Sequence, residues 1–494
     1  MSSTAAPRPL TFRTKLFYGL GSISFGVHVQ VFALLLFFYS AVVGVPAGLV
    51  SLALAATLVI DAVWDPIVGQ LSDTLRTPWG RRHPLMYFSA VPVAVTMVLL
   101  WRPPASFSNP EKAVWLFAFS LLARLFISLY EVPSQALAPE LAPDYHARTA
   151  LLSYRWIFYV IGASGATMLG YFVFFRPTPH YPQGQLNPAA WGPLTLTAAA
   201  MAVASIVIST LGTHDRITSL HRPLRRALDL RRSFREIAAV VTNWNLCVAM
   251  GASLIAGLSA GFYLGLQLYI DTFFWGLKAS GVGLLTLAAL VAVIPGAWVA
   301  NAFSRRFGKK YACITIFLVS TAVLQGPMLL RLLGLFPGPG DPLELPLLVS
   351  VRFLWGIVVN AGFIVVTSMV ADITEDAQVK TGRRVEGLVM AANAFIVKAT
   401  AGLSALAPGI LLAYTHFPTK AMSVPAPVIN HLVWVYLPVT TTISVLSILT
   451  WMLYRIDQAT HERNLAAVGE AQAVAEAQLE AQGEGALTPL RAAG

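Results

Sequence analysis

Long apolar runs, separated by short polar segments, recur along the chain from residue 16 to residue 454. A helix needs about 20 apolar residues to cross the hydrocarbon core of a membrane, and these runs reach that length throughout. We therefore predict an all-α membrane protein. Its expected spans are twelve helices, at 16–40, 47–72, 84–102, 113–138, 149–174, 191–212, 238–270, 281–302, 310–333, 345–371, 385–414 and 430–454.

The composition agrees with this prediction. Of the 494 residues, 56% are hydrophobic and only 12% are charged, whereas a soluble chain carries about 25% charged residues. The net charge of +11 could suggest a nucleic-acid partner, but the basic residues lie between apolar runs rather than on one domain. We therefore expect contact with a lipid bilayer and none with nucleic acid.

The basic residues also predict the orientation of the chain. They cluster in every second segment between spans, and the alternate segments, such as 176–193 and 335–346, are rich in Pro and Gly. Because Lys and Arg favour the cytoplasmic side, both termini are predicted to be cytoplasmic, in the inner or plasma membrane. The main cationic groups are Arg13 and Lys15, then Arg76, Arg81 and Arg82, then Arg305, Arg306, Lys309 and Lys310, and finally Lys380, Arg383 and Arg384.

A basic segment at 213–237 divides the predicted spans into two sets of six. We expect a cytoplasmic segment at 1–15, a six-helix bundle at 16–212, a second bundle at 238–455 and a cytoplasmic tail at 456–494. A weak repeat supports the division, since Gly80-Arg81-Arg82 is matched by Gly308-Lys309-Lys310. Two parallel six-helix halves around a midplane site are the major facilitator architecture.

Span two contains two carboxylates, Asp61 and Asp65, which lie four residues apart and so on one helical face. Pro66 frees a backbone carbonyl beside them. Two carboxylates in a low-dielectric core resist double ionisation and require a proton, a metal cation or a basic partner. Lys398 in span eleven could be that partner, so we predict a cation-coupling site, with Asp61 and Asp65 as metal ligands if the ion is Na⁺. The alternative is a fixed ion pair that only joins helices.

Charged residues in spans four and five suggest a solute site. Arg124 and Glu131 lie seven residues apart on one face of span four, Tyr130 precedes the glutamate, and Arg155 begins span five. A carboxylate and a guanidinium from neighbouring helices can bind hydroxyl groups through paired hydrogen bonds. We predict that these four residues contact the solute. The alternative is a Glu131–Arg155 strut between helices.

Charged residues at the cytoplasmic turns are predicted to control access to the solute site rather than to bind solute. They would form a network that holds the inner side closed and breaks when that side opens: Asp73, Arg81, Arg82, Asp372, Arg384 and Glu386. The sequence has no phosphate-binding loop, nucleophile elbow or cluster of metal ligands. We therefore expect neither an enzyme nor a cofactor.

The residues of spans two and eleven resemble those of a known family. Asp61-Ala62-Val63-Trp64-Asp65-Pro66, followed by Trp79-Gly80-Arg81-Arg82-His83-Pro84, and the Ile396-Val397-Lys398 segment are similar to the melibiose permease family, the glycoside–pentoside–hexuronide:cation symporters of the major facilitator superfamily. The resemblance implies a cation site at Asp61 and Asp65 with Lys398 close by. It also places the family's sugar-binding acid of span four at Glu131 and its span-five arginine at Arg155.

Two departures from the family pattern change the expectation. The sugar-binding acid of span one aligns with Gly26, and the asparagine before the second aspartate of span two is Trp64 here. The second departure favours H⁺ over Na⁺. We expect a monomer that couples H⁺ or Na⁺ to the symport of a sugar or glycoside by alternating access. The alternatives are a carrier of an amphipathic lipid-like solute and a membrane sensor that does not transport.

Overall fold

The computed structural model describes residues 10–142, 145–219, 244–381, 386–420 and 422–456, together with 460, 462–464 and 467. Most of the predicted middle segment and tail, and the predicted gating residue Arg384, lie outside these residues, as do the side chains of Lys398 and Glu386. Within the described residues the regular structure is helical, with one isolated β-bridge between Thr77 and Gly80. The predicted all-α class is confirmed.

The helices of the first part of the chain begin with a broken first span. Its segments are α1 (Phe12–Leu20), α2 (Ser22–Ala33), α3 (Leu35–Phe37) and the π-helical turn η1 (Phe38–Val43). The elements that follow are α4 (Ala47–Thr74), α5 (His83–Leu100), α6 (Asn109–Leu141), α7 (Tyr145–Met168), η2 (Leu169–Phe174), η3 (Gly184–Leu186), α8 (Pro188–Gly212) and η4 (His214–Ser219).

The helices of the second part follow the same scheme. They are α10 (Trp244–Tyr269), the π-helical turn η5 (Ile270–Phe274), α11 (Ala279–Val291), α12 (Val293–Leu332), α13 (Glu344–Thr381), α14 (Glu386–Tyr414) and α15 (Ala426–Met452). Ten helices among the described residues are long and apolar enough to cross a membrane, and two shorter apolar helices lie at Ala279–Val291 and Thr400–Tyr414. This set is consistent with twelve spans.

The boundary between predicted spans eight and nine differs from the prediction. The predicted spans leave a loop at 303–309. In the structure these residues belong to α12, which is 40 residues long and turns at Gly308, whose backbone is not helical (φ 73°, ψ 158°). A glycine adopts positive φ without a steric penalty. The chain therefore reverses direction at one residue instead of in a loop.

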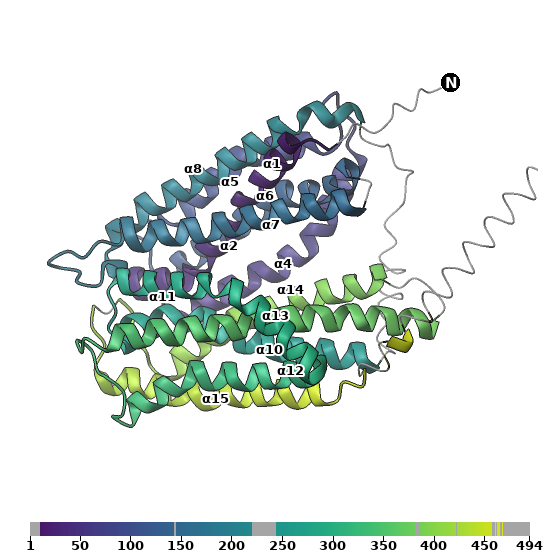
Figure 1. Ribbon diagram of the computed structural model, residues 1–494. Coiled ribbons are helices and arrows are strands. Elements are labelled where there is room, and N and C mark those ends of the chain that lie inside the picture. Colours follow the sequence, from purple (N-terminus) through teal and green to yellow (C-terminus); the bar gives the residue numbers. More distant parts are fainter. Residues whose placement is uncertain are drawn as a thin grey trace, which may run out of the picture.

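The helices form two bundles, α1–α8 and α10–α15, which lie one above the other in Figure 1. Arg76, Arg81 and Arg82 lie where α4 ends and α5 begins, at the end of the molecule that we call the cationic end. The opposite end, where α5 ends, we call the aromatic end, because Phe38, Trp101 and Trp191 pack there with ring centroids 4.7–5.2 Å apart. The bundles meet at the aromatic end and diverge toward the cationic end (Figure 1).

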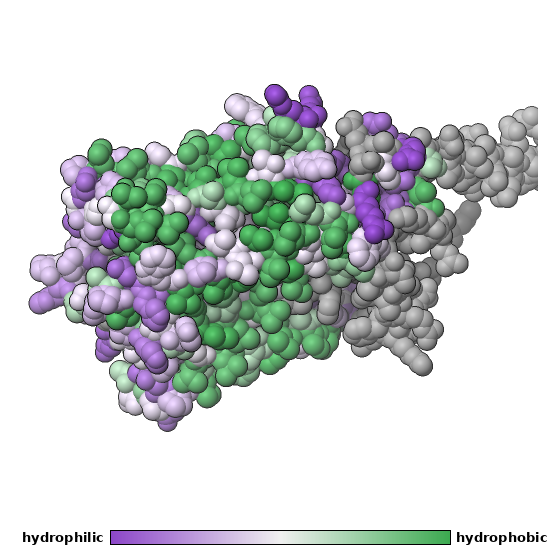
Figure 2. All heavy atoms as spheres, turned by 90° about the horizontal axis from the view of Figure 1, so that it is seen from below, coloured by the Kyte–Doolittle hydropathy of each residue, from purple (hydrophilic) through white to green (hydrophobic). Residues whose placement is uncertain are grey.

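The outer surface is suited to lipid. Figure 2 shows apolar side chains over the middle of the molecule and polar side chains toward its ends. Large apolar residues are widely exposed, among them Val59 (66%), Ile294 (67%) and Trp298 (72%). Soluble monomers rarely expose so much contiguous apolar surface, so this band lies in the hydrocarbon region of a bilayer.

Contacts between the bundles seal the aromatic end. Phe37 of the first bundle packs edge-on against Tyr269 of the second, with centroids 5.1 Å apart. The Tyr269 hydroxyl donates to the Leu36 carbonyl oxygen (3.1 Å), and Gln185 Nε2 donates to Thr272 Oγ1 (3.0 Å). These aromatic and hydrogen-bond contacts close the space between the bundles on one side only.

Within the first bundle, α2 and α7 approach very closely at two glycines. A Cβ atom at Gly26 would collide with the Tyr159 carbonyl oxygen, and one at Gly162 would lie 2.5 Å from the Ile23 carbonyl oxygen. Small residues allow such close helix contacts in membranes. The acid that the family resemblance places at Gly26 therefore has no room in this structure.

We predict that Gly26→Ala lowers the thermal stability of the purified protein. The new methyl group must push α2 away from α7, and overpacking of this kind costs about 1–3 kcal/mol. The control is Gly165→Ala on α7, where a Cβ would meet only the end of the Met201 side chain, at 3.8 Å. Thermal unfolding in detergent measures both variants, and equal midpoints for them would contradict the packing argument.

Candidate functional site

Asp61 and Asp65 lie one turn apart on α4, and each has a partner on α6. Arg124 Nη1 lies 3.8 Å from Asp61 Oδ2, and the two side chains are 21% and 16% exposed. The Ser128 hydroxyl donates to Asp65 Oδ1 at 2.7 Å. Ser128 follows Arg124 by one helical turn, so the two α6 side chains match the spacing of the two aspartates. We call these four residues the carboxylate group.

The structure separates Arg124 from the other predicted solute residues. Its guanidinium contacts Asp61 and lies 4.9 Å from the centre of the Phe32 ring, a cation–π contact. Glu131 instead pairs with Arg155. Sequence spacing placed Arg124 on the same helix as Glu131, but only the packing of α4 on α6 could show which acid it meets.

Glu131 and Arg155 form the second polar cluster of the first bundle. Arg155 Nη2 donates to Glu131 Oε1, and Arg155 Nη1 donates to Ser134 Oγ (3.1 Å) and Tyr18 OH (3.3 Å). Gln135 Nε2 also donates to Glu131 Oε1 (3.0 Å). The second oxygen, Oε2, is buried and has no hydrogen-bond partner within the described part of the chain. It is an acceptor that remains available to a hydroxyl group.

Tyr130 does not join this pair. Its side chain is fully buried, and its hydroxyl packs against Gly21 of the first span, where a Cβ atom would collide with it. The ring therefore fills the contact between α6 and the first span. The predicted solute contact at Tyr130 stays a prediction.

α14, which carries Lys398, packs along α4, which carries the two aspartates. Near the aromatic end the two helices approach so closely that a Cβ atom at Gly409 would collide with the Ser51 hydroxyl. Lys398 and the two aspartates therefore lie on helices that pack against each other. The pairing of the lysine amine with a carboxylate stays a prediction.

The predicted gating residues of the first bundle share a partner that sequence analysis missed. Arg81 and Arg82 both bind the same oxygen of Glu140, Oε1, with Arg82 Nε at 2.8 Å. Asp73 lies 3.4 Å from Arg82 Nη2 and is 58% exposed. Predicted span four ends at residue 138 and does not include Glu140, whereas α6 continues to Leu141.

The second bundle has a matching ion pair at the cationic end. Lys309 Nζ lies 2.6 Å and 2.8 Å from the two oxygens of Asp372, and Lys310 Nζ donates to the Tyr454 carbonyl oxygen (2.8 Å). Burial raises the pKa of the Tyr454 phenol, and the nearby Asp372 raises it further. Each of these networks joins helices of a single bundle. The gating role of these charges stays a prediction.

A buried ion pair in the second bundle was also missed. Arg352 Nη2 lies 2.9 Å and 3.3 Å from the two oxygens of Asp271, and Arg352 Nη1 donates to Tyr263 OH. Predicted span seven ended at residue 270, whereas the helix continues through the π turn η5 to Phe274. A span longer by one turn would have revealed Asp271 as a charge inside the membrane.

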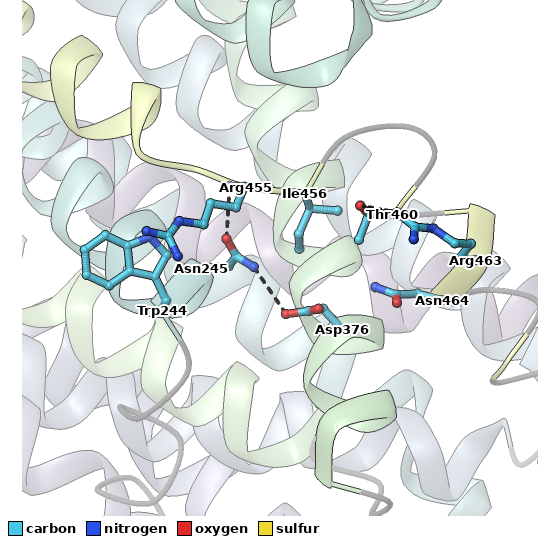
Figure 3. Close-up of a pocket in the computed structure, with 8 residues that line it drawn as sticks. All are labelled: Trp244, Asn245, Asp376, Arg455, Ile456, Thr460, Arg463 and Asn464. Atoms are coloured by element: carbon cyan, nitrogen blue, oxygen red, sulfur yellow. Dashed lines mark hydrogen bonds between the residues drawn. The ribbon is translucent and has the colours of Figure 1, made fainter.

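A pocket of about 350 Å³ lies at the cationic end of the second bundle (Figure 3). Within it, Asn245 Nδ2 donates to Asp376 Oδ2 (3.3 Å), and Asn245 Oδ1 accepts from the Arg455 amide (3.0 Å). The Arg455 guanidinium lies 4.9 Å from the centre of the Trp244 ring. These bonds attach the segment after α15 to α10 and α13, so we assign the pocket a structural role.

Comparison with known proteins gives one family and several relatives. A family model described as MFS/sugar transport protein matches residues 17–458. The chain is 25% identical to the isoprimeverose transporter of Lactiplantibacillus pentosus, over 86% of this chain and 84% of that protein. It is 23% identical to an inner membrane symporter of Escherichia coli, over 82% and 83%.

Two further similarities have narrower scope. An uncharacterized symporter of Synechocystis is 30% identical over 56% of this chain, and the match spans 50% of that protein's length. The crystal structure of a mutant of the nucleoside transporter NupG superposes with a TM-score of 0.61 at 12% identity, covering 90% of this chain and all of that one. At this identity the likeness shows the fold alone, and the predicted major facilitator architecture is confirmed.

We predict that Asp271→Asn destabilises the protein. The change leaves the buried Arg352 guanidinium without a compensating charge, and breaking a buried pair in this way costs about 3–5 kcal/mol. Asp73→Asn is the control, because an exposed pair contributes at most about 1 kcal/mol. Thermal unfolding in detergent compares the variants. The double variant Asp271→Asn/Arg352→Met should recover part of the loss, and a single variant as stable as the wild type would contradict the assignment.

Proposed function

The chain belongs to the MFS/sugar transport protein family, and from this premise we propose that it carries a sugar or glycoside across the membrane together with a cation. The observation that carries the proposal is the carboxylate group on α4 and α6. Charged side chains inside a membrane span are costly and mark ion or substrate pathways. Relatives named as a sugar transporter and a symporter support the same conclusion.

The carboxylate group is proposed to couple the ion to conformational change. Asp61 and Asp65 lie on a helix of the first bundle, and α14 of the second bundle packs along that helix. A positive charge that arrives at or leaves these carboxylates changes the electrostatic free energy of contacts between the bundles. Ion binding at this place can therefore favour one arrangement of the bundles over the other.

The Glu131–Arg155 pair is proposed to bind the solute. Its unpartnered Oε2 atom can accept a hydrogen bond from a hydroxyl group, and the guanidinium can donate to the neighbouring oxygen. Adjacent hydroxyls on a sugar ring present this combination of donor and acceptor. Because an acid has no room at Gly26, the proposed solute site contains one carboxylate, that of Glu131. This supports a solute other than melibiose.

Alternating access follows from the way the bundles meet. They are sealed by Phe37, Tyr269 and Gln185 at the aromatic end and diverge toward the cationic end (Figure 1). If the cationic end is cytoplasmic, as the basic residues predict, this arrangement faces inward. We propose a monomer in the inner membrane with both termini in the cytoplasm. Uptake requires the aromatic seal to part and the cationic ends to close.

The direct test is uptake into proteoliposomes. Purified protein is offered a panel of labelled sugars and glycosides, and one lysophospholipid, with a pH gradient and a Na⁺ gradient imposed separately. We expect accumulation of one sugar or glycoside above its external concentration under one of the gradients. Accumulation of the lysophospholipid alone would favour the lipid-like solute, and binding without flux would favour the sensor.

We predict that Asp65→Asn abolishes accumulation but preserves exchange of labelled for unlabelled solute. Exchange needs no net movement of the ion, whereas accumulation requires a carboxylate whose charge the ion can neutralise. The control is Asp341→Asn, an exposed residue of the loop before α13, which should behave as the wild type. Accumulation by Asp65→Asn would contradict the coupling role.

Glu131→Gln and Arg155→Gln should each raise the solute concentration that half-saturates exchange. A hydrogen bond to a charged group contributes about 1.5–3 kcal/mol, so we expect a change of about 10- to 100-fold. Glu111→Gln is the matched control, because Glu111 is exposed and only caps α6 through Ser108. If this concentration is unchanged in both variants, the pair does not bind the solute and only connects α6 to α7.

A further inference from the structure

We propose that Arg124 is a resident cation of the carboxylate group and that it excludes Na⁺ from Asp61 and Asp65. This inference rests on the proposed coupling role of the two aspartates and addresses which ion they can accept. It is carried by the position of one side chain, whose guanidinium lies 3.8 Å from Asp61 Oδ2.

The first step is the charge of the site. The predicted metal site consists of two carboxylates, but the structure places a guanidinium against one of them. An arginine does not lose its proton in proteins, so this positive charge is permanent. A Na⁺ ion at the same carboxylate would lie a few ångströms from a like charge, in a region where such repulsion is only weakly screened.

The second step is that the protein holds the guanidinium in place. Its central carbon lies over the Phe32 ring of α2, 4.9 Å from the ring centre. Its Nε is buried and has no hydrogen-bond partner within the described part of the chain. The side chain is therefore kept at this position by the ring and by the charge of Asp61, rather than by a network of hydrogen bonds.

The third step is the set of oxygen ligands. Hard cations such as Na⁺ bind oxygen atoms. Trp64, which replaces the asparagine of melibiose permease, supplies no oxygen, and its Nε1 donates to the Leu125 carbonyl oxygen at 3.1 Å. That bond fixes α4 to α6 beside Arg124.

The residues of the carboxylate group thus fit an internal cation better than a bound Na⁺ ion. Removing the arginine charge is therefore expected to let these carboxylates accept Na⁺. Arg124 is then a residue that determines ion specificity, rather than the solute contact that its spacing from Glu131 suggested.

Sodium binding to the purified protein tests this without any solute. The probe is ²²Na⁺, measured by scintillation proximity with the wild type and with Arg124→Gln, Arg124→Met and Arg124→Lys. We expect negligible binding by the wild type and by Arg124→Lys, and binding at least about 100-fold tighter by the glutamine and methionine variants, as expected when a like charge at about 4 Å is removed. Asp65→Asn added to Arg124→Gln should abolish the gain.

Arg102→Gln is the matched control, because Arg102 is exposed at the aromatic end and its removal should create no sodium site. Sodium binding by the wild type that Asp65→Asn removes would overturn the proposal. So would folded, monodisperse glutamine and methionine variants that bind no more sodium than the wild type. Because both Arg124→Gln and Arg124→Met are measured, the test still stands if one of them fails to fold. Because the assay uses no sugar, a failure of the transport experiment and a failure of this one are distinguishable.

Discussion

The structure depends on one constraint, that a charge inside the bilayer must be compensated by another part of the protein. Hydration cannot do this in the hydrocarbon region, where an isolated charge is expensive. Three pairs among the described residues meet the requirement: Asp61–Arg124, Glu131–Arg155 and Asp271–Arg352. Each joins neighbouring helices of one bundle. In the second pair, one carboxylate oxygen, Glu131 Oε2, has no hydrogen-bond partner in the part of the chain that the structure describes.

The same constraint separates the parts that stay fixed from the parts that move. At the cationic end, Glu140 pairs with bases of the first bundle and Asp372 with a lysine of the second. The bundles meet mainly through aromatic rings, close helix contacts and a few hydrogen bonds at the aromatic end. Such contacts can part without exposing an unpaired charge to lipid. Rigid bundles with a separable contact are what alternating access requires.

Much of the fold and part of the site could be predicted from the sequence. Apolar runs of sufficient length can satisfy their backbone groups only as helices in lipid, so the positions of the spans followed directly. The errors lay at helix ends. Asp271 and Glu140 were missed because α-helical periodicity does not show that a helix continues by a π turn or by one more turn of α-helix. Both residues are acids whose partners lie far away in the sequence.

The sequence by itself determined the membrane class, the helical architecture and the choice of Asp61, Asp65, Glu131 and Arg155 as candidates, because an ionisable residue inside a long apolar run is costly and can be recognised from the sequence alone. Which acid meets which base was decided by the tertiary structure alone. Arg124 could have faced Glu131 along its own helix, but the packing of α4 on α6 brings Asp61 to it, and the Phe32 ring of α2 lies against its guanidinium. Pairing is a property of helix contacts, and helical periodicity carries no information about the neighbouring helix.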